Sequence, residues 1–233
     1  MTEWKRHHGG KGWSYEKPSG YIQIEGEEEN PRTKGAALSA AYILEDFFND
    51  IKEAQGRFPD VSWATIVAII CCEANKLKHP LEHGSPSIAK YHRDIKSPRW
   101  EPKPKVYSAG LMQTLTSTAT RMNKKYDLVY NGSKIDPHDL MNPRASILLG
   151  TAYLSDIGAK HDHDPVKAQA AYNAGSVKKT TKNPWRMLTY SPNRTEKYIR
   201  YHNDAVFALK ALAKAGGFGR DFWVMIRKNT LEP

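Results

Sequence analysis

The chain has 233 residues, of which 39% are hydrophobic and 26% charged, a composition typical of a soluble globular protein rather than a disordered one. Its longest unbroken apolar run, residues 66–72, is far shorter than the ~18 residues of a membrane-spanning helix, and its only two cysteines are adjacent, which excludes a disulfide framework. The net charge of +10 is uneven, because residues 176–233 contain 12 basic and 4 acidic residues, a net +8.

The first 34 residues differ in composition from the rest of the chain. They are rich in glycine, contain an acidic run at 25–29 and carry scattered aromatic residues. This pattern predicts an N-terminal arm or tail over residues 1–34, with a short strand at 21–24, followed by one domain over residues 35–233. The first ten residues contain no apolar stretch, so we expect no secretory signal peptide.

Apolar spacing predicts that this domain begins with two helices. Apolar residues recur every three or four positions from Leu38 to Ile51, which indicates an amphipathic helix. Ser62 is a suitable N-cap for a second helix, which is apolar on nearly all sides and ends at Glu73. A helix of that kind is expected in the core.

The middle of the chain predicts an irregular excursion. Residues 79–107 contain five of the 14 prolines, a density that no long helix tolerates, so we expect an irregular connection with room for a small β-hairpin. We expect helical structure to resume near Gly110.

Two cap-and-proline pairs predict the starts of later helices. They are Asn142-Pro143 and Asp164-Pro165, and further helices are expected over 194–214 and 218–228. The predicted fold class is therefore mainly α.

Glu73 is the first candidate for chemistry. Burial and the negative end of a helix dipole both raise the pKa of a carboxyl group, and a carboxyl group that is protonated near neutral pH can act as a general acid on a glycosidic bond. The alternative is a glutamate that merely reaches solvent from a helix end. Three other segments could line a ligand site or could equally be packing elements: the turn 108–113, the helix end 170–175 and the helix carrying Tyr198.

Taken in order, the Glu-terminated helix, Ser-Ala-Gly-Leu-Met-Gln and Ala-Ala-Tyr-Asn-Ala-Gly resemble the soluble lytic transglycosylase catalytic domain over roughly residues 60–212. This family is lysozyme-like and related to goose-type lysozymes. The resemblance implies cleavage of the MurNAc-β-1,4-GlcNAc bond of peptidoglycan glycan strands, with formation of 1,6-anhydroMurNAc and without a cofactor or metal. One glutamate then serves first as acid and later as base, and Glu73 matches it. The positions matched to substrate binding are Ser108, Gly110, Leu111, Met112, Gln113, Tyr172, Asn173 and Tyr198.

The sequence also departs from the family pattern. Ala74 follows Glu73 where the family usually has serine, and 37 positions separate Glu73 from Gly110, more than the family leads us to expect. The added stretch brings three carboxylates that could hold a water for hydrolysis in the manner of a goose-type muramidase, which keeps hydrolysis open as an alternative. They are Glu82, Asp94 and Glu101.

Other function classes fit less well. The basic C-terminal quarter could bind nucleic acid, but a cationic enzyme would use the same charge to approach an anionic wall or outer-membrane lipopolysaccharide, so we expect no nucleic acid partner. A non-catalytic wall-binding protein would not need Glu73. His79 and His83 are four apart, but Pro80 lies between them, so we expect no metal site. We expect a monomer made in a host cytoplasm, as a bacteriophage endolysin released by a holin or as an enzyme carried in the virion.

Overall fold

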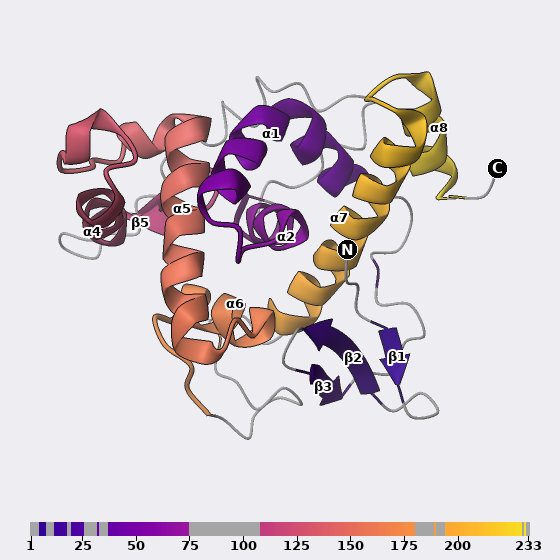
Figure 1. The fold of residues 1–233 in the computed structure, drawn as a ribbon, viewed down its shortest axis with the longest axis horizontal. Coiled ribbons are helices and arrows are strands. Elements are labelled where there is room, and N and C mark those ends of the chain that lie inside the picture. Colours follow the sequence, from indigo (N-terminus) through magenta and orange to yellow (C-terminus); the bar gives the residue numbers. More distant parts are fainter. Residues whose placement is uncertain are drawn as a thin grey trace.

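The computed structural model describes residues 5–7, 12–17, 20–25, 32, 37–74, 108–179, 189, 194–229 and 231. The described part is mainly helical, which confirms the predicted fold class (Figure 1). The helices are α1 (Leu38–Arg57), α2 (Trp63–Ala74), α4 (Thr116–Tyr126), α5 (Pro143–Gly158), α6 (Pro165–Ala174), α7 (Arg194–Ala215) and α8 (Arg220–Lys228), with short 3-10 turns η2 (Tyr130–Gly132), η3 (Asp139–Met141) and η4 (Ala159–His161). No described helix is long and apolar enough to cross a bilayer.

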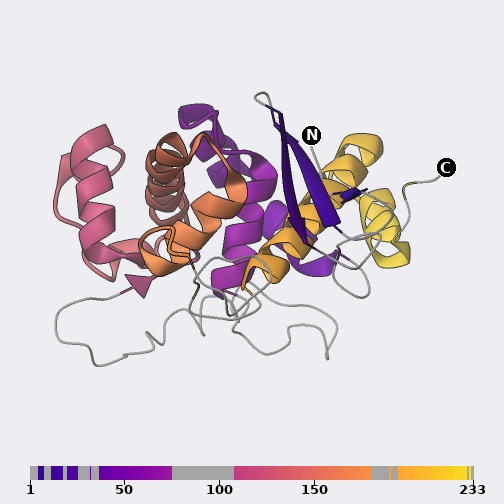
Figure 2. The ribbon, with the colours of Figure 1, turned by 90° about the horizontal axis from the view of Figure 1, so that it is seen from below.

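The N-terminal segment forms a small antiparallel sheet beside α7 (Figures 1 and 2). Its strands are β1 (Lys5–His7), β2 (Gly12–Lys17) and β3 (Gly20–Glu25), in the order β1-β2-β3. The strand predicted at 21–24 lies within β3 and is confirmed.

Arg32 fastens the end of this segment to α7. Its Nε lies 3.3 Å from Oδ1 of Asp204, and its guanidinium carbon lies 3.9 Å from the centre of the Phe207 ring. Its carbonyl oxygen accepts a hydrogen bond from Nη1 of Arg200 over 2.8 Å. The N-terminal segment therefore contacts the helical domain, while the domain boundary at residue 34 stays a prediction.

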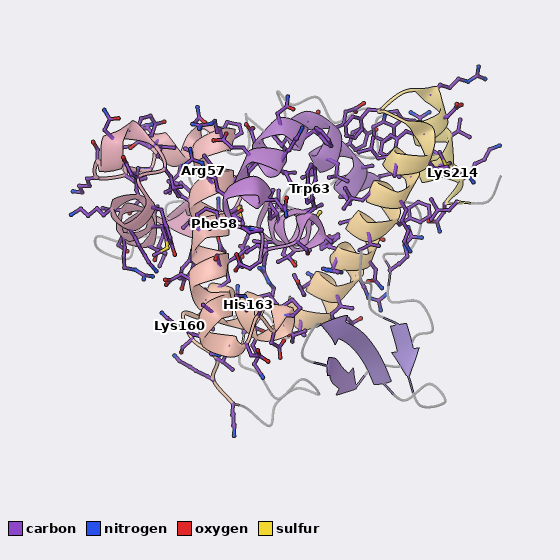
Figure 3. The ribbon with its side chains drawn as sticks, in the orientation of Figure 1. Arg57, Phe58, Trp63, Lys160, His163 and Lys214 are labelled. Atoms are coloured by element: carbon purple, nitrogen blue, oxygen red, sulfur yellow. The ribbon has the colours of Figure 1, made fainter. Side chains whose placement is uncertain are left out.

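The core is built around α2. Residues 66–71 of α2 are buried, as the unbroken apolar sequence predicted, and α2 makes its most extensive contacts with α7. Full burial of each Ile or Val side chain is worth about 1.5–3 kcal/mol. Phe58 and Trp63, labelled in Figure 3, bracket the turn between α1 and α2, where they pack against the rings of Tyr126 and Phe48. This packing fixes where α2 enters the core.

Helix starts follow the predicted caps. The Ser62 side chain accepts from the Thr65 N–H over 3.1 Å at the start of α2. Asn142 accepts from the backbone at the start of α5 and Asp164 at the start of α6, and each is followed by proline. These three predictions are confirmed.

One helix start was predicted wrongly. The helix expected near Gly110 begins only at Thr116, because residues 108–115 form a small β-hairpin, with strands β4 (Ser108–Ala109) and β5 (Thr114–Leu115). The physical reason is local, since Gly110 (φ +78°) and Gln113 (φ +48°) both adopt left-handed conformations that a helix cannot contain. The irregular connection predicted over 79–107 lies outside the described residues, and this small hairpin follows it, before the next helix.

Candidate active site

Glu73 lies in the last turn of α2 and is paired with a residue far along the chain. Arg194, the first residue of α7, donates from Nη2 to Oε1 of Glu73 over 2.7 Å. The Glu73 and Arg194 side chains are 11% and 6% exposed, so the ion pair is largely removed from water. Within the described part of the chain, no further hydrogen bond reaches the Glu73 carboxyl group. Arg194 therefore binds one oxygen of the Glu73 carboxyl group, and no described donor binds the other.

The charge of Arg194 follows from its surroundings. Burial acts to lower the pKa of Arg194, but neighbouring Cys72 and Glu73 outweigh it, so the pKa lies above its ordinary value. Burial raises the pKa of the Cys72 thiol to about 11, although the Arg194 charge opposes this. The guanidinium is therefore charged at neutral pH, and the thiol beside it is neutral.

The turn predicted to bind substrate is the loop of the β4–β5 hairpin. The backbone N–H and the side-chain Nε2 of Gln113 both donate to the carbonyl oxygen of Gly110, over 3.2 and 2.9 Å. Oε1 of Gln113 accepts from the hydroxyl of the exposed Ser108 over 3.3 Å. The Gln113 amide thus stabilises its own turn, and a ligand that engages it must exchange for one of these hydrogen bonds.

Leu111 and Met112 were also matched to substrate binding, but the structure places both in the core, 2% and 0% exposed. The Met112 N–H donates to the hydroxyl of Ser146 over 3.2 Å. Gly150 faces the Met112 side chain so closely that an added Cβ would lie 2.5 Å from its sulfur. Met112 therefore anchors the hairpin on α5, Leu111 adds to the core, and Gly110 and Gln113 form the turn itself.

Tyr172, near the end of α6, reaches the same hairpin. Its hydroxyl donates to the carbonyl oxygen of Met112 over 2.9 Å, so the Thr114 hydroxyl, 2.8 Å away, is the donor in the second hydrogen bond. Burial raises the pKa of Tyr172 well above its usual value, a Thr114 hydrogen bond opposes this, and the neighbouring carboxyl group of Glu73 adds to it. Tyr172 is a neutral clamp between α6 and the hairpin, and the half-buried Asn173 follows it on α6.

Tyr198 lies elsewhere. Its hydroxyl is 3.2 Å from the hydroxyl of Thr65, and the side chain is fully buried. Thr65 and Glu73 are eight residues apart on α2, about 12 Å along the helix axis. The structure thus places Tyr198 two turns away from the glutamate that it was expected to approach.

Three predicted residues lie outside the described part of the chain: Glu82, Asp94 and Glu101. Sequence reasoning also missed two residues of the site. Arg194 and Thr114 contact Glu73 and Tyr172, respectively. One signal for Arg194 was available, because a basic residue at a helix N-terminus is disfavoured by the helix dipole and so needs a specific partner.

Sequence comparison decides the family of this chain. Residues 51–187, more than half of its length, match the family model described as the Transglycosylase SLT domain. The chain belongs to this family. The match confirms the resemblance, and it contains the end of α2, the hairpin and α6. Arg194 and Tyr198 lie beyond the matched residues of the SLT domain.

Curated relatives match a part of this chain. The soluble lytic murein transglycosylase of Salmonella typhimurium is 38% identical over 79 residues, and that of Escherichia coli K12 is 36% identical over 78, each covering 33% of this chain and 12% of the relative. A Haemophilus influenzae protein named in the same class is 42% identical over 67 residues, 29% of this chain and 11% of that protein. The aligned part of the chain spans about an eighth or less of the length of these relatives.

Viewed from below (Figure 2), the last turn of α2, the hairpin and the first turn of α7 reach the same side of the molecule. Tyr172 contacts the hairpin through the Met112 carbonyl, and Glu73 lies close enough to Tyr172 to raise its pKa. The Arg194 ion pair joins α7 to α2, the Tyr172 hydrogen bonds join α6 to the hairpin, and the hydrogen bond from Gln169 to Thr195 joins α6 to α7. A general acid placed there would stand on four rigid elements.

Proposed function

We propose that the protein cleaves peptidoglycan as a lytic transglycosylase, with Glu73 as its acid and base. The observation that carries this proposal is the coincidence of two results. The SLT match spans residues 51–187, and within it Glu73 is the largely buried carboxylate at the end of the core helix α2. A carboxylate fixed in such a place suits proton transfer to a bound ligand.

The proposed reaction needs one carboxyl group and no water. Glu73 gives its proton to the glycosidic oxygen as the bond from C1 of MurNAc to O4 of GlcNAc breaks. The C6 hydroxyl of the same MurNAc then attacks C1, and Glu73 takes the hydroxyl proton. The new bond closes a 1,6-anhydro ring, and Glu73 ends protonated as it began. The usual glycosidase needs a second carboxylate to activate water or to act as nucleophile.

The rest of the site would orient the sugars. The Gly110–Gln113 turn offers backbone and amide groups at the hairpin tip, and Tyr172 holds this turn against α6. Asn173 stands beside Tyr172 as a second candidate for a sugar contact. Such positioning is worth more to the rate than its individual hydrogen bonds suggest, since a displacement of about 1 Å can cost about a hundredfold.

The test is mass spectrometry of the products released from purified Gram-negative peptidoglycan. We expect fragments with 1,6-anhydroMurNAc ends, one water lighter than hydrolysis products. We expect Glu73→Gln to lower the rate by about 10²–10⁴-fold, the usual contribution of an acid-base group. The matched control is Glu53→Gln, since Glu53 also accepts from an arginine, Arg144, but lies outside the site.

Two results would revise the proposal. Products with ordinary reducing ends would indicate hydrolysis and would direct attention to Glu82, Asp94 and Glu101. Equal activity of the Glu73→Gln and Glu53→Gln variants would show that Glu73 is not the acid.

We also propose that the basic C-terminal quarter of the chain binds anionic outer-membrane lipopolysaccharide. Exposed basic side chains of the C-terminal quarter include Lys214, near the end of α7 (Figure 3). Helix α8 adds Arg220, Arg227 and Lys228, all exposed, next to the exposed Val224. This composition suits an anionic outer membrane, and vesicles with and without lipopolysaccharide, at low and high salt, would test it.

We further propose that the protein acts as a monomeric bacteriophage enzyme, made in a host cytoplasm and brought to the wall by a holin or in the virion. The two free cysteines fit a reducing compartment. Light scattering tests the monomer, and lysis of cells with and without a co-expressed holin tests the route.

A further inference from the structure

Arg194 occupies a position that is unfavourable for a cation. It is the first residue of α7, where the helix dipole repels positive charge, and only 5% of the residue is exposed. Removing a guanidinium from water costs several kcal/mol unless its donors are satisfied. The ion pair with Glu73 offsets part of this cost, so the question is what its other donors bind.

The donors of Arg194 are incompletely used. A guanidinium has five N–H groups in a fixed fork, and the contact with Glu73 engages Nη2 alone. Nε is buried and has no hydrogen-bond partner among the described residues. Buried donors without partners are rare in folded proteins, and a charged one is especially unfavourable.

A second arginine in the same chain shows what full pairing looks like. Arg144 grips Glu53 with Nε and Nη2 at once, over 2.7 and 2.6 Å, one nitrogen for each carboxyl oxygen. Arg194 meets only Oε1 of Glu73, with one nitrogen. The contact of Arg194 with Glu73 is therefore a single hydrogen bond, and the Nε side of the guanidinium has no acceptor among the described residues.

Two neighbours of Arg194, Cys72 and Tyr172, do not supply that acceptor. The Cys72 thiol is neutral because burial raises its pKa, and the Tyr172 hydroxyl donates to Met112. The start of α7 is also fixed in place, because Gln169 of α6 donates to the hydroxyl of Thr195 over 3.0 Å. The guanidinium is therefore already oriented, and a ligand that displaced the atoms covering Nε would meet a charged donor.

We propose that Arg194 binds the substrate, with Nε–H donating to an amide or carboxyl carbonyl oxygen of the glycan while Nη2 holds Glu73. This inference rests on the proposed function and names the substrate group that the site recognises. Two groups of a peptidoglycan strand carry such an oxygen: the acetamido group, present on every sugar, and the lactyl group, present on MurNAc alone. One guanidinium bound to both the substrate and Glu73 fixes the distance between the acid and the sugar.

The test measures binding by calorimetry in the catalytically impaired Glu73→Gln background. Two probes separate the two oxygen sources, a hexamer of N-acetylglucosamine and purified peptidoglycan glycan strands. Arg194→Lys retains the charge beside position 73 but removes the fork, so we expect its dissociation constant to rise about tenfold, the value of one such hydrogen bond. Arg144→Gln is the matched control, and we expect it to bind within twofold of the background.

Each outcome decides something. If the Arg194→Lys variant binds both probes more weakly, Arg194 contacts the acetamido group. If it binds only the glycan strands more weakly, Arg194 contacts the lactyl group. If the Arg194→Lys variant binds both probes within twofold of the Glu73→Gln background, the inference is wrong and the proposed function stands. If a folded Glu73→Gln protein binds neither probe, both the inference about Arg194 and the proposed function are wrong.

A direct measurement keeps the inference testable if Arg194→Lys does not fold. In ¹⁵N-labelled Glu73→Gln protein, the Nε–H resonance of Arg194 should shift when the recognised probe is added, and its exchange with water should slow. A structural role alone would leave this signal where it is. An unchanged Arg194 signal at saturating concentrations of both probes would contradict the inference.

Discussion

Gly110→Ala provides a sharp test of how the hairpin is held. Gly110 has φ +78°, and an added Cβ would lie 2.0 Å from the carbonyl oxygen of Leu140 and 2.5 Å from the hydroxyl oxygen of Ser146. The left-handed conformation costs an alanine about 1–2 kcal/mol. Displacing the Leu140 backbone and the Ser146 side chain adds the usual cost of overpacking, about 1–3 kcal/mol. We therefore expect Gly110→Ala to lower the free energy of unfolding by about 2–5 kcal/mol.

Gly175→Ala is the matched control. Gly175 has nearly the same backbone angle, φ +79°, but apart from its chain neighbours no atom of the described residues lies within 4 Å of the position of its Cβ. The Gly175→Ala variant should lose only the conformational part of the free energy of unfolding, about 1–2 kcal/mol. Urea unfolding followed by circular dichroism measures both variants, and a domain of this size loses about 2–4 °C of Tm per kcal/mol. Equal losses in the two variants would refute the argument that close approach to α5 fixes the hairpin.

Two further predictions concern the clamp at Tyr172 and a carboxyl group on α1. Tyr172→Phe removes a donor from the Met112 carbonyl, so we expect a loss of about 1 kcal/mol in urea unfolding and a lower kcat; Tyr153→Phe, the neighbouring ring, is the control, and an equal loss there would argue against the clamp. Burial and Glu45 raise the pKa of Asp46 to about 6, so between pH 4 and 6 the folded state binds the proton more tightly and stability falls as pH rises. Asp46→Asn should therefore be more stable than the wild type above pH 6, by on the order of 1 kcal/mol after allowance for solvent screening, and the gain should vanish near pH 4; a gain independent of pH would contradict this.

Features governed by neighbouring residues could be predicted from the sequence. Ser62, Asn142 and Asp164 cap helices through hydrogen bonds to backbone groups two or three residues away, so the cap and its target lie in one short window. The burial of α2 followed in the same way from its unbroken apolar stretch. Glu73 was located by the same logic, as the first charged residue after that stretch.

Features governed by distant residues could not be predicted. Met112 was expected to face substrate, but Ser146 and Gly150 of α5 draw it into the core. Arg194 and Glu73 are 121 positions apart, and no periodicity or spacing in either segment signals their contact. The identities of the residues were visible throughout, but the partners became visible only with the fold.

The placement of Tyr198 illustrates how such distant contacts combine. Arg194 and Tyr198 are one turn apart on α7, and they meet α2 at Glu73 and Thr65, near its two ends. Two contacts at different heights fix both the rotation of α7 and its axial position relative to α2. A slip of α7 by one residue, about 1.5 Å, would break the buried Tyr198–Thr65 contact and the Arg194–Glu73 ion pair together. We therefore expect Tyr198 to act as a positioning residue. Its contact with Thr65 lies about 12 Å along α2 from Glu73, and it would set where the guanidinium of Arg194 meets the carboxyl group of Glu73.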